Sequence, residues 1–180
     1  MRKSLVLRGY LAIFLASSAL VMPSVASAQQ SPPACTAPAP ALPESLSGWT
    51  KAQPMPAAAS VDLLGASALT PGKAIDATLM QTPDVKYVVL PEKPGGTVSY
   101  GGMYLFKVET AGTYRVALGS GAWIDVLKGG QAMTSVAHGH GPDCSGIRKM
   151  VDFALQPGAY TLQVAANGAP SVRLMVSRLP

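Results

Sequence analysis

Short segments in which every second residue is apolar recur along the chain from about residue 61 to its end. The alternation is clearest at residues 75–79, 114–118, 151–155, 160–164 and 172–176. A period of two turns one row of side chains inward and the other toward water, as in half-buried antiparallel strands. Three denser apolar runs, at residues 85–90, 103–108 and 122–127, are predicted to be central strands.

Turn-forming residues separate these runs. Examples are Pro94-Gly95-Gly96, Gly129-Gly130, Pro157-Gly158 and Asn167-Gly168. About eight strands at roughly ten-residue spacing are typical of a sandwich or barrel. The chain has 13% charged residues with 18 Gly and 16 Pro, a composition unlike that of a coiled coil or helical bundle. We therefore expect an all-β fold at residues 60–180, an antiparallel, jelly-roll-like β-sandwich.

The N-terminus has the pattern of an export signal. Arg2, Lys3 and Arg8 precede an apolar run at residues 10–21, and Ala26-Ser27-Ala28 supplies the small residues of a cleavage site. Twelve residues in a helix are too short for a hydrocarbon core of about 30 Å. The sequence thus predicts a signal peptide at residues 1–28, a periplasmic or secreted protein, and no membrane span after cleavage.

Charge argues against a nucleic-acid partner. Removal of Arg2, Lys3 and Arg8 leaves 11 basic against 9 acidic residues, a net charge of +2. A nucleic-acid-binding surface needs basic residues clustered on one face. Here the remaining Lys and Arg residues are mostly scattered singly, so no nucleic-acid partner is expected.

Prolines dominate residues 29–59, at positions 32, 33, 38, 40, 43, 54 and 56. Each proline removes a backbone donor and favours extended geometry in the residue before it. This stretch is expected to be an arm outside the folded elements. Leu46 and Trp49 are its candidate anchor to the domain, and a ligand-stacking role for the indole is the alternative.

The two cysteines, Cys35 and Cys144, are predicted to form a disulfide. The prediction rests on their even number and on the oxidising compartment implied by export. Such a bond would join the arm to the domain.

Both histidines of the chain fall in one short segment, at residues 138–144 (HGHGPDC). If the segment is extended, His138 and His140 face the same side and could share an ion. Asp143, or a Cys144 thiolate outside a disulfide, could be a third ligand for a divalent transition metal such as Zn, Cu or Fe. Two alternatives stay open: a solvated loop without a ligand, and a loop that contacts a ligand or a partner.

Other patterns for catalysis are weak. No phosphate-binding glycine loop or nucleophile elbow occurs. Asp125 and Asp152 fall on the strand faces opposite Ile124 and Val151, where exposure to solvent is expected. Arg148 and Lys149 are interpreted as a solvated strand entry, although together with the histidines they could attract an acidic ligand.

Part of the chain resembles known families. The segments at residues 106–118 (FKVETAGTYRVAL), 123–125 (WID) and 155–162 (LQPGAYTL) resemble the jelly-roll sandwiches of pre-peptidase C-terminal-like domains. The H-x-H-x-x-x-C pattern is similar to that of a group of small exported proteobacterial proteins. Some of these are labelled automatically as homogentisate dioxygenases. The resemblance covers residues 61–180 and implies a fold more than an activity.

The expected function is therefore that of an exported, non-catalytic β-sandwich that binds a metal ion, a ligand or an envelope protein at the histidine segment. The alternative is a cupin-like, metal-dependent dioxygenase of the homogentisate type that uses His138, His140 and Asp143. Cys144 stands where the cupin pattern has a glutamate, and no third histidine exists in the chain.

Overall fold

The computed structural model describes Cys35 and residues 41–180. The predicted signal peptide and residues 29–34 and 36–40 of the predicted arm lie outside the described residues. The chain divides into two compact units, Met1–Ala34 and Cys35–Pro180. All that follows concerns the second unit.

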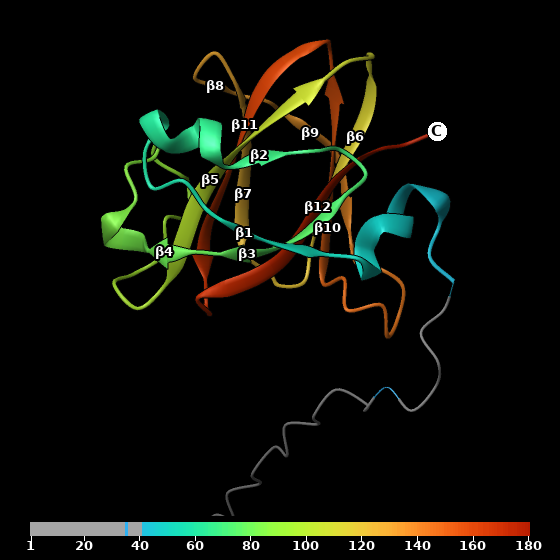
Figure 1. Ribbon diagram of the computed structural model, residues 1–180, viewed down its shortest axis with the longest axis horizontal. Helices are drawn as coiled ribbons and strands as arrows, with labels where there is room; N and C mark the ends of the chain where they lie inside the picture. Colours follow the sequence, from blue (N-terminus) through green and yellow to red (C-terminus); the bar gives the residue numbers. More distant parts are fainter. Residues whose placement is uncertain (1–34, 36–40) are drawn as a thin grey trace, which may run out of the picture. The chain divides into compact units, whose positions relative to one another are not determined.

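Two six-stranded sheets form the body of this unit (Figure 1). The elements in chain order are three 3-10 helices, η1 (Glu44–Thr50), η2 (Val61–Ala66) and η3 (Thr82–Asp84), and twelve strands, β1 (Gln53–Pro56), β2 (Ala68–Leu69), β3 (Ala74–Thr78), β4 (Met80–Gln81), β5 (Tyr100–Val108), β6 (Gly112–Leu118), β7 (Trp123–Lys128), β8 (Gln131–Ala132), β9 (Ser135–Gly139), β10 (Lys149–Leu155), β11 (Gly158–Asn167) and β12 (Ser171–Arg178).

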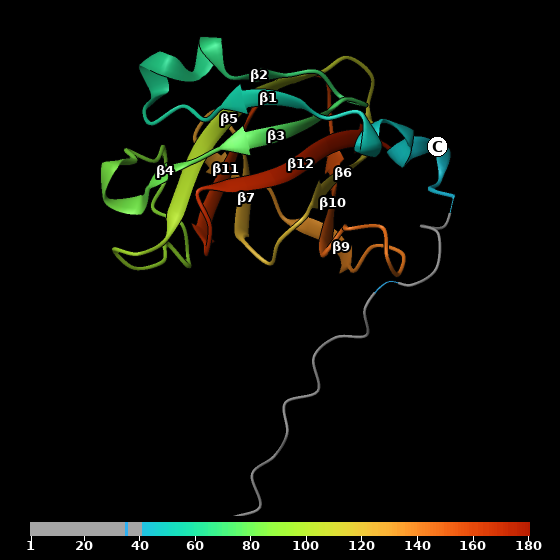
Figure 2. The same ribbon diagram turned by 60° about the horizontal axis from the view of Figure 1, so that its bottom comes forward.

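The strand order is β1-β3-β12-β6-β10-β9 in the first sheet and β2-β5-β11-β7-β8 in the second, where β4 also pairs with β5. Pairing is antiparallel except for β1 with β3 and β2 with β5, one parallel pair in each sheet. Figure 2 shows the two sheets as opposed layers. The predicted all-β sandwich is confirmed, and its antiparallel character holds for all but these two short pairs.

The main core lies between the sheets and is built by the alternating residues. Val116, Leu162 and Leu174 point inward from β6, β11 and β12 and are buried in one cluster. Phe106 and Tyr160 stack in the same cluster with ring centroids 5.5 Å apart. Because the longer strands contribute alternate residues to this cluster, the period of two in the sequence is the direct cause of the core.

The outer face of the first sheet carries a second, smaller core under η1. Trp49 is 2% exposed and packs with Leu46 against Met175 of β12 and Ile147. The Trp49 indole N–H donates a 3.0 Å hydrogen bond to the backbone oxygen of Ser145. The predicted anchoring role of Trp49 is thereby confirmed.

The expectation that residues 44–56 lie outside the folded elements is wrong. They form η1 and β1, and β1 extends the first sheet by pairing with β3. The prolines of β1 fit this edge position. Ala57 donates to the Thr78 oxygen, so alternation turns positions 54 and 56 away from β3, where a missing N–H costs no sheet hydrogen bond.

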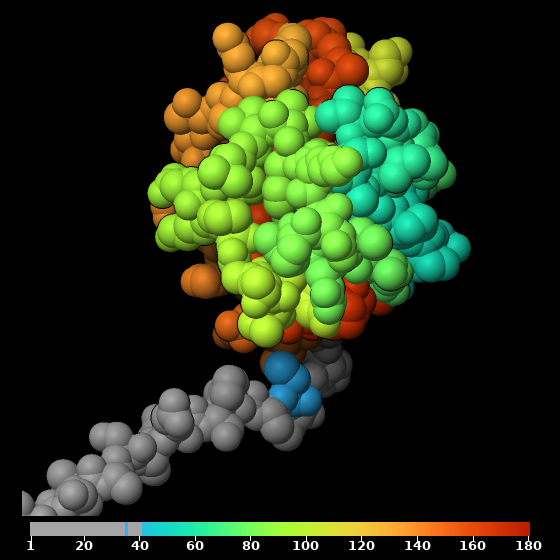
Figure 3. All heavy atoms as spheres, turned by 90° about the vertical axis from the view of Figure 1, so that its left-hand side faces the viewer, coloured from blue at the N-terminus to red at the C-terminus, as the bar shows by residue number. Residues whose placement is uncertain are grey.

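The outer face of the second sheet is covered by η2 and by the segment that follows β4. Leu64 and Val85 pack there against Met103 of β5. Figure 3 shows the green residues of this segment beside the teal residues around η2 on one face of the molecule.

Residues 85–90, predicted to be a central strand, form no strand. Instead, the side chain of Gln163, which is 1% exposed, accepts a hydrogen bond from the Val88 N–H and donates one to the Val89 oxygen. One buried side chain thus takes the place of a partner strand. Val85 at the start of the run is buried, but Val88 and Val89 remain on the outside, and Leu90 is 80% exposed.

The predicted disulfide between Cys35 and Cys144 is present, with the two Cα atoms 5.5 Å apart. It joins the start of the second unit to the loop between β9 and β10. Among the residues that the structure describes, no helix is long and apolar enough to cross a membrane.

Candidate functional site

The candidate site arises where the chain changes from one sheet to the other. Strand β8 pairs with β7 in the second sheet, and Met133 still donates to the Val126 oxygen. Two residues later β9 begins, and it pairs with β10 in the first sheet. The crossing leaves the first half of β7 without a partner strand on that side, and a pocket opens between β7 and β9.

This cavity, which we call the histidine pocket, has a volume of about 660 Å³. It is lined by Glu92, Trp123, Ile124, Asp125, Met133, Thr134, Ser135, His138, Gly139, His140, Lys149, Val151 and Phe153.

The floor of the histidine pocket is apolar. Ile124, Val151 and Phe153 belong to the main core, and Met133 packs against that core from the side. The pocket therefore reaches to the edge of the space between the sheets. Ile124, Val151 and Phe153 are already buried, at 3–7% exposure, so an apolar guest that packs on this floor would mainly remove its own apolar surface from water, at roughly 25 cal/mol per Å².

The two histidines line one side of this pocket. His138 lies opposite Val151, an inward-facing residue of β10, so the two side chains share a face. His140 follows two positions later and lines the same cavity. The sequence interpretation that both imidazoles face one side agrees with this placement.

A backbone contact fixes the His140 ring. Its Nδ1 lies 2.7 Å from the backbone oxygen of Arg148. A carbonyl oxygen only accepts, so Nδ1 carries the proton in the neutral ring and Nε2 keeps its lone pair. His140 is thus prepared to accept a hydrogen bond or bind a metal through Nε2.

Asp143, the third predicted ligand, does not line the histidine pocket. It lies beyond the strand, in the loop next to disulfide-bonded Cys144. Within residues 35 and 41–180, no three His, Cys, Asp or Glu side chains are placed to share an ion. The metal site of His138, His140 and Asp143 therefore stays a prediction, and the disulfide removes Cys144 as a thiolate ligand.

Trp123 and Asp125 form the opposite side of the pocket. They lie two residues apart on β7, and the Trp123 indole N–H donates a 3.1 Å hydrogen bond to Asp125 Oδ1. Asp125 Oδ2 is buried and has no hydrogen-bond partner among the described residues. Burial raises the pKa of Asp125, and the nearby charge of Glu92 adds to the rise. The side-chain donors of Trp123 and Gln163 and the charge of Lys149 partly oppose it.

The sequence analysis expected Asp125 to be exposed to solvent. The segment that follows β4 lies close to Asp125 and reduces its contact with water. Tyr87 from this segment donates a 2.9 Å hydrogen bond to the Val164 oxygen. Burial, followed by the nearby charge of Asp125, raises the pKa of Tyr87 to about 12. The segment brings Glu92 to the pocket as a second carboxylate.

Two lysines meet at the Trp123 ring. The ammonium nitrogens of Lys93 and Lys149 lie 5.1 and 5.5 Å from its centroid. Lys149 also donates a 2.8 Å hydrogen bond to the Ala122 oxygen. Burial lowers the pKa of Lys149 and the charge of Lys93 lowers it further, whereas the charge of Asp125 opposes this shift. Lys149 is thus partly buried within the pocket, which differs from the solvated strand entry that we expected.

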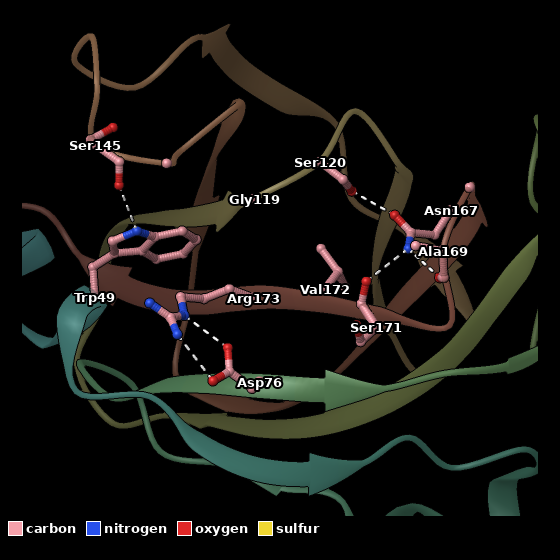
Figure 4. Close-up of a pocket in the computed structure, with 12 residues that line it drawn as sticks. Trp49, Asp76, Gly119, Ser120, Ser145, Asn167, Ala169, Ser171, Val172 and Arg173 are labelled. Carbon is pink, nitrogen blue, oxygen red and sulfur yellow. Dashed lines mark hydrogen bonds and ion pairs between the residues drawn. The ribbon is translucent and has the colours of Figure 1, made fainter. Parts of the chain in front are cut away.

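A second cavity, which we call the arginine cleft, lies beside η1 and has a volume of about 590 Å³ (Figure 4). The guanidinium of Arg173 donates two hydrogen bonds to Asp76, of 2.8 and 3.0 Å. Across the cleft, Ser120 donates to Asn167 Oδ1, and Asn167 donates to the backbone oxygens of Ala169 and Ser171. Arg173, Asp76, Ser120 and Asn167 are therefore occupied with one another or with the backbone (Figure 4).

Asp152 corrects a further expectation. It was predicted to be exposed but is 6% exposed, and it accepts two 2.8 Å hydrogen bonds from Arg115, directly opposite on β6. An arginine opposite a carboxylate on one sheet face forms a bidentate pair that covers both groups. Asp152 is part of the sheet and not of the histidine pocket.

Sequence analysis found the histidines but missed most of the pocket. Trp123, Asp125 and Lys149 were each noted in the sequence and assigned to strand chemistry or solvent. One signal in the sequence linked two of these residues: the i, i+2 spacing of Trp123 and Asp125 places both on one face of a strand. No local pattern linked Lys149 to them.

Comparisons with known proteins add little to this picture. No protein-family model matches the chain, and no curated protein is similar to it. Among solved structures, the chain is similar to the pre-peptidase C-terminal domain of a collagenase from Bacillus anthracis. The identity is 20% and the TM-score 0.33, over 46% of this chain and 81% of that one. A likeness at this level carries no argument, and the fold stands on the strand pairing described above.

Proposed function

We propose that the protein is an exported, non-catalytic binding protein and that its ligand enters the histidine pocket. In this proposal the ligand inserts an apolar group onto the floor of the pocket. Its polar end meets the side chains around the rim. The signal-like N-terminus and the disulfide support export.

The observation that carries the proposal is the combination of an apolar floor with polar groups whose bonding capacity is unused. Asp125 Oδ2 lacks a partner among the described residues, and His140, whose Nε2 keeps its lone pair, lines the same cavity. A buried polar atom without a partner costs about 1–3 kcal/mol. A ligand that satisfies such atoms recovers part of that cost on binding.

Metal binding belongs to the same proposal. His138 and His140 are the residues that would hold a divalent transition metal such as Zn, Cu or Fe, and the ligand itself would complete its coordination. The hydrogen bond from His140 Nδ1 to the Arg148 oxygen supports this role, because ligating histidines usually anchor their other nitrogen in this way.

No observation favours the dioxygenase alternative. Its iron site needs two histidines and a carboxylate close together. The described part of the chain offers no such group of three. We therefore propose no reaction.

The binding proposal is tested with 8-anilinonaphthalene-1-sulfonate (ANS), an apolar dye that becomes fluorescent when shielded from water. We expect one dye molecule per mature, untagged protein. Ser135, opposite Phe153 at the start of β9, is changed to tyrosine to fill the pocket. Ser135→Tyr should weaken ANS binding at least about tenfold, which corresponds to about 1.4 kcal/mol.

Ser171→Tyr is the matched control, because Ser171 is also an exposed serine at the start of a strand and lines the arginine cleft. Equal effects of the two substitutions would contradict the proposal. Thermal unfolding of both variants verifies that they are folded.

Metal binding is tested by zinc competition against a colorimetric indicator. We expect His138→Ala with His140→Ala to abolish zinc binding and Asp143→Ala to leave it unchanged. Loss of binding in Asp143→Ala would instead restore the three-ligand site predicted from the sequence.

A further inference from the structure

We propose that the ligand class of the histidine pocket is the apolar acid: a molecule whose hydrophobic body lies on the pocket floor and whose single anionic group lies beside Trp123. There it would be near the ammonium group of Lys149, which lines the pocket, and that of Lys93, which lies over the same ring. This inference rests on the proposed function, because it names the chemistry of the ligand for the same pocket.

The first support is the position of the two ammonium groups. Both nitrogens lie within 5.1 to 5.5 Å of the centroid of one indole ring. The charge of Lys93 acts on Lys149 and lowers its pKa, and an anion near both ammonium groups would offset this repulsion with two attractions. A cationic guest would be repelled by these two ammonium groups, which already make the cation–π contacts with the indole ring.

The second support is that neither lysine forms an ion pair among the described residues, although the charge of Asp125 partly compensates that of Lys149. In the part of the chain that the structure describes, the ion pairs are Lys107 with Glu109, Arg115 with Asp152 and Arg173 with Asp76. Lys93 and Lys149 form none. Lys149 uses one donor on the Ala122 oxygen, and an ammonium group has three.

The third support is the distribution of charge around the pocket. His138, His140 and Lys149 come from the β9 and β10 side, whereas the carboxylates of Asp125 and Glu92 come from β7 and the segment above it. The apolar floor lies between the two sides. The two carboxylates disfavour a second negative charge in the guest, so the inference is limited to acids with one anionic group.

Desolvation strengthens the argument for Lys149. Its ammonium is partly buried, so water compensates its charge poorly, and its pKa is lowered by burial and by Lys93. A charge that is poorly solvated in the free protein gains most from a counter-ion delivered by a ligand.

The test compares two dyes that differ in charge. ANS carries a sulfonate, and N-phenyl-1-naphthylamine has the same ring system without it. We expect Lys93→Met with Lys149→Met to weaken ANS binding at least about tenfold and to leave the neutral dye within about twofold, because methionine keeps the apolar stem. Lys73→Met with Lys107→Met, at two exposed lysines outside the pocket, is the control of equal charge and should change neither affinity.

Salt provides a second measurement that needs no variant. Between 20 and 300 mM NaCl, about a threefold loss of ANS affinity and no loss for the neutral dye is expected, because screening weakens only the charged contact. Equal responses of the two dyes to the lysine changes and to salt would overturn the inference. If Ser135→Tyr still weakened the binding of both dyes, the proposed function would stand although the inference about acids had failed. If Ser135→Tyr weakened the binding of neither dye, the proposed function itself would be contradicted.

Discussion

The histidine pocket and the arginine cleft are similar in size, about 660 and 590 Å³, but differ in the state of their polar groups. In the cleft, Arg173 is held by Asp76 with two hydrogen bonds, and Asn167 is bonded on both its oxygen and its nitrogen. In the pocket, a carboxylate oxygen of Asp125 has no partner among the described residues, and two lysines share one indole ring.

The difference indicates that cavity volume alone does not identify a binding site. Polar groups that satisfy one another contribute to stability and have little left to offer a ligand. Groups held near each other without partners are costly to the free protein and are therefore candidates for function. On this basis, changes in the cleft should affect folding, and changes in the pocket should affect binding.

Opening the disulfide should have the largest effect on stability and little effect on binding. The bond closes a loop of 109 residues, for which chain entropy predicts at most about 4–5 kcal/mol. Cys144 adjoins Ser145, which lines the cleft, whereas β9 is held by its pairing with β10. We expect Cys35→Ser with Cys144→Ser to lower the free energy of unfolding in urea while ANS affinity stays within about twofold.

Thiol titration of the denatured wild-type protein, purified from the periplasm, provides the control for this prediction. No titratable thiol is expected. Two titratable thiols would show that the bond is absent from the protein as produced.

The next largest effect is expected in the cleft. Asn167 is 1% exposed and its amide makes hydrogen bonds with Ser120, Ala169 and Ser171. Asn167→Ala should lower the free energy of unfolding by about 2–3 kcal/mol, because it removes these bonds at a buried site. Ser120→Ala, which removes one of them, should cost about 1 kcal/mol.

Both variants should bind ANS like the wild type. A loss of dye affinity in Asn167→Ala at a temperature where the variant is folded would break the distinction between the two cavities.

The smallest effect concerns two carboxylates, one in each cavity, whose pKa values shift in opposite directions. Burial raises the pKa of Asp125, so the folded protein binds the proton of this carboxyl more tightly than the unfolded chain does. The contribution of Asp125 to the free energy of unfolding therefore decreases as pH rises from about 4 through the raised pKa. The hydrogen bonds from Arg173 lower the pKa of Asp76, so its contribution is present above about pH 4 and is lost as pH falls through the lowered pKa.

Urea unfolding between pH 3 and 7 measures both slopes. Asp125→Asn should stabilise the protein at pH 7, by less than about 1 kcal/mol because the group is half-exposed. Asp76→Asn should reduce stability at pH 7 and have no effect at the acid end. The same sign for both substitutions at pH 7 would contradict the assignment.

The fold was largely predictable from the sequence because it depends on a local pattern. Alternating residues such as those of β6 and β12 form strands wherever the inward row finds a core, and that row is visible in the sequence. The prediction failed where a tertiary contact replaced a local preference. Gln163 binds residues 88 and 89 in place of a strand, and Leu46 and Trp49 draw a proline-rich segment onto the first sheet.

The site was less predictable for the same reason. His138 lies on β9 and His140 directly follows the end of that strand, so their spacing alone indicated a shared side. The partners across the pocket come from β7, β10 and the segment after β4, and no local pattern connects these segments. Asp143 was a candidate because it is close in sequence, but the structure places Asp125 and Glu92, and not Asp143, around the same cavity.

The most direct test is a map of amide chemical shifts during an ANS titration of the ¹⁵N-labelled mature protein. We predict that the largest changes fall at residues 123–125, 133–140 and 149–153, which surround the histidine pocket. Changes centred on residues 119–120 and 167–173, around the arginine cleft, would contradict the claim that ligands bind where polar groups are left unpaired.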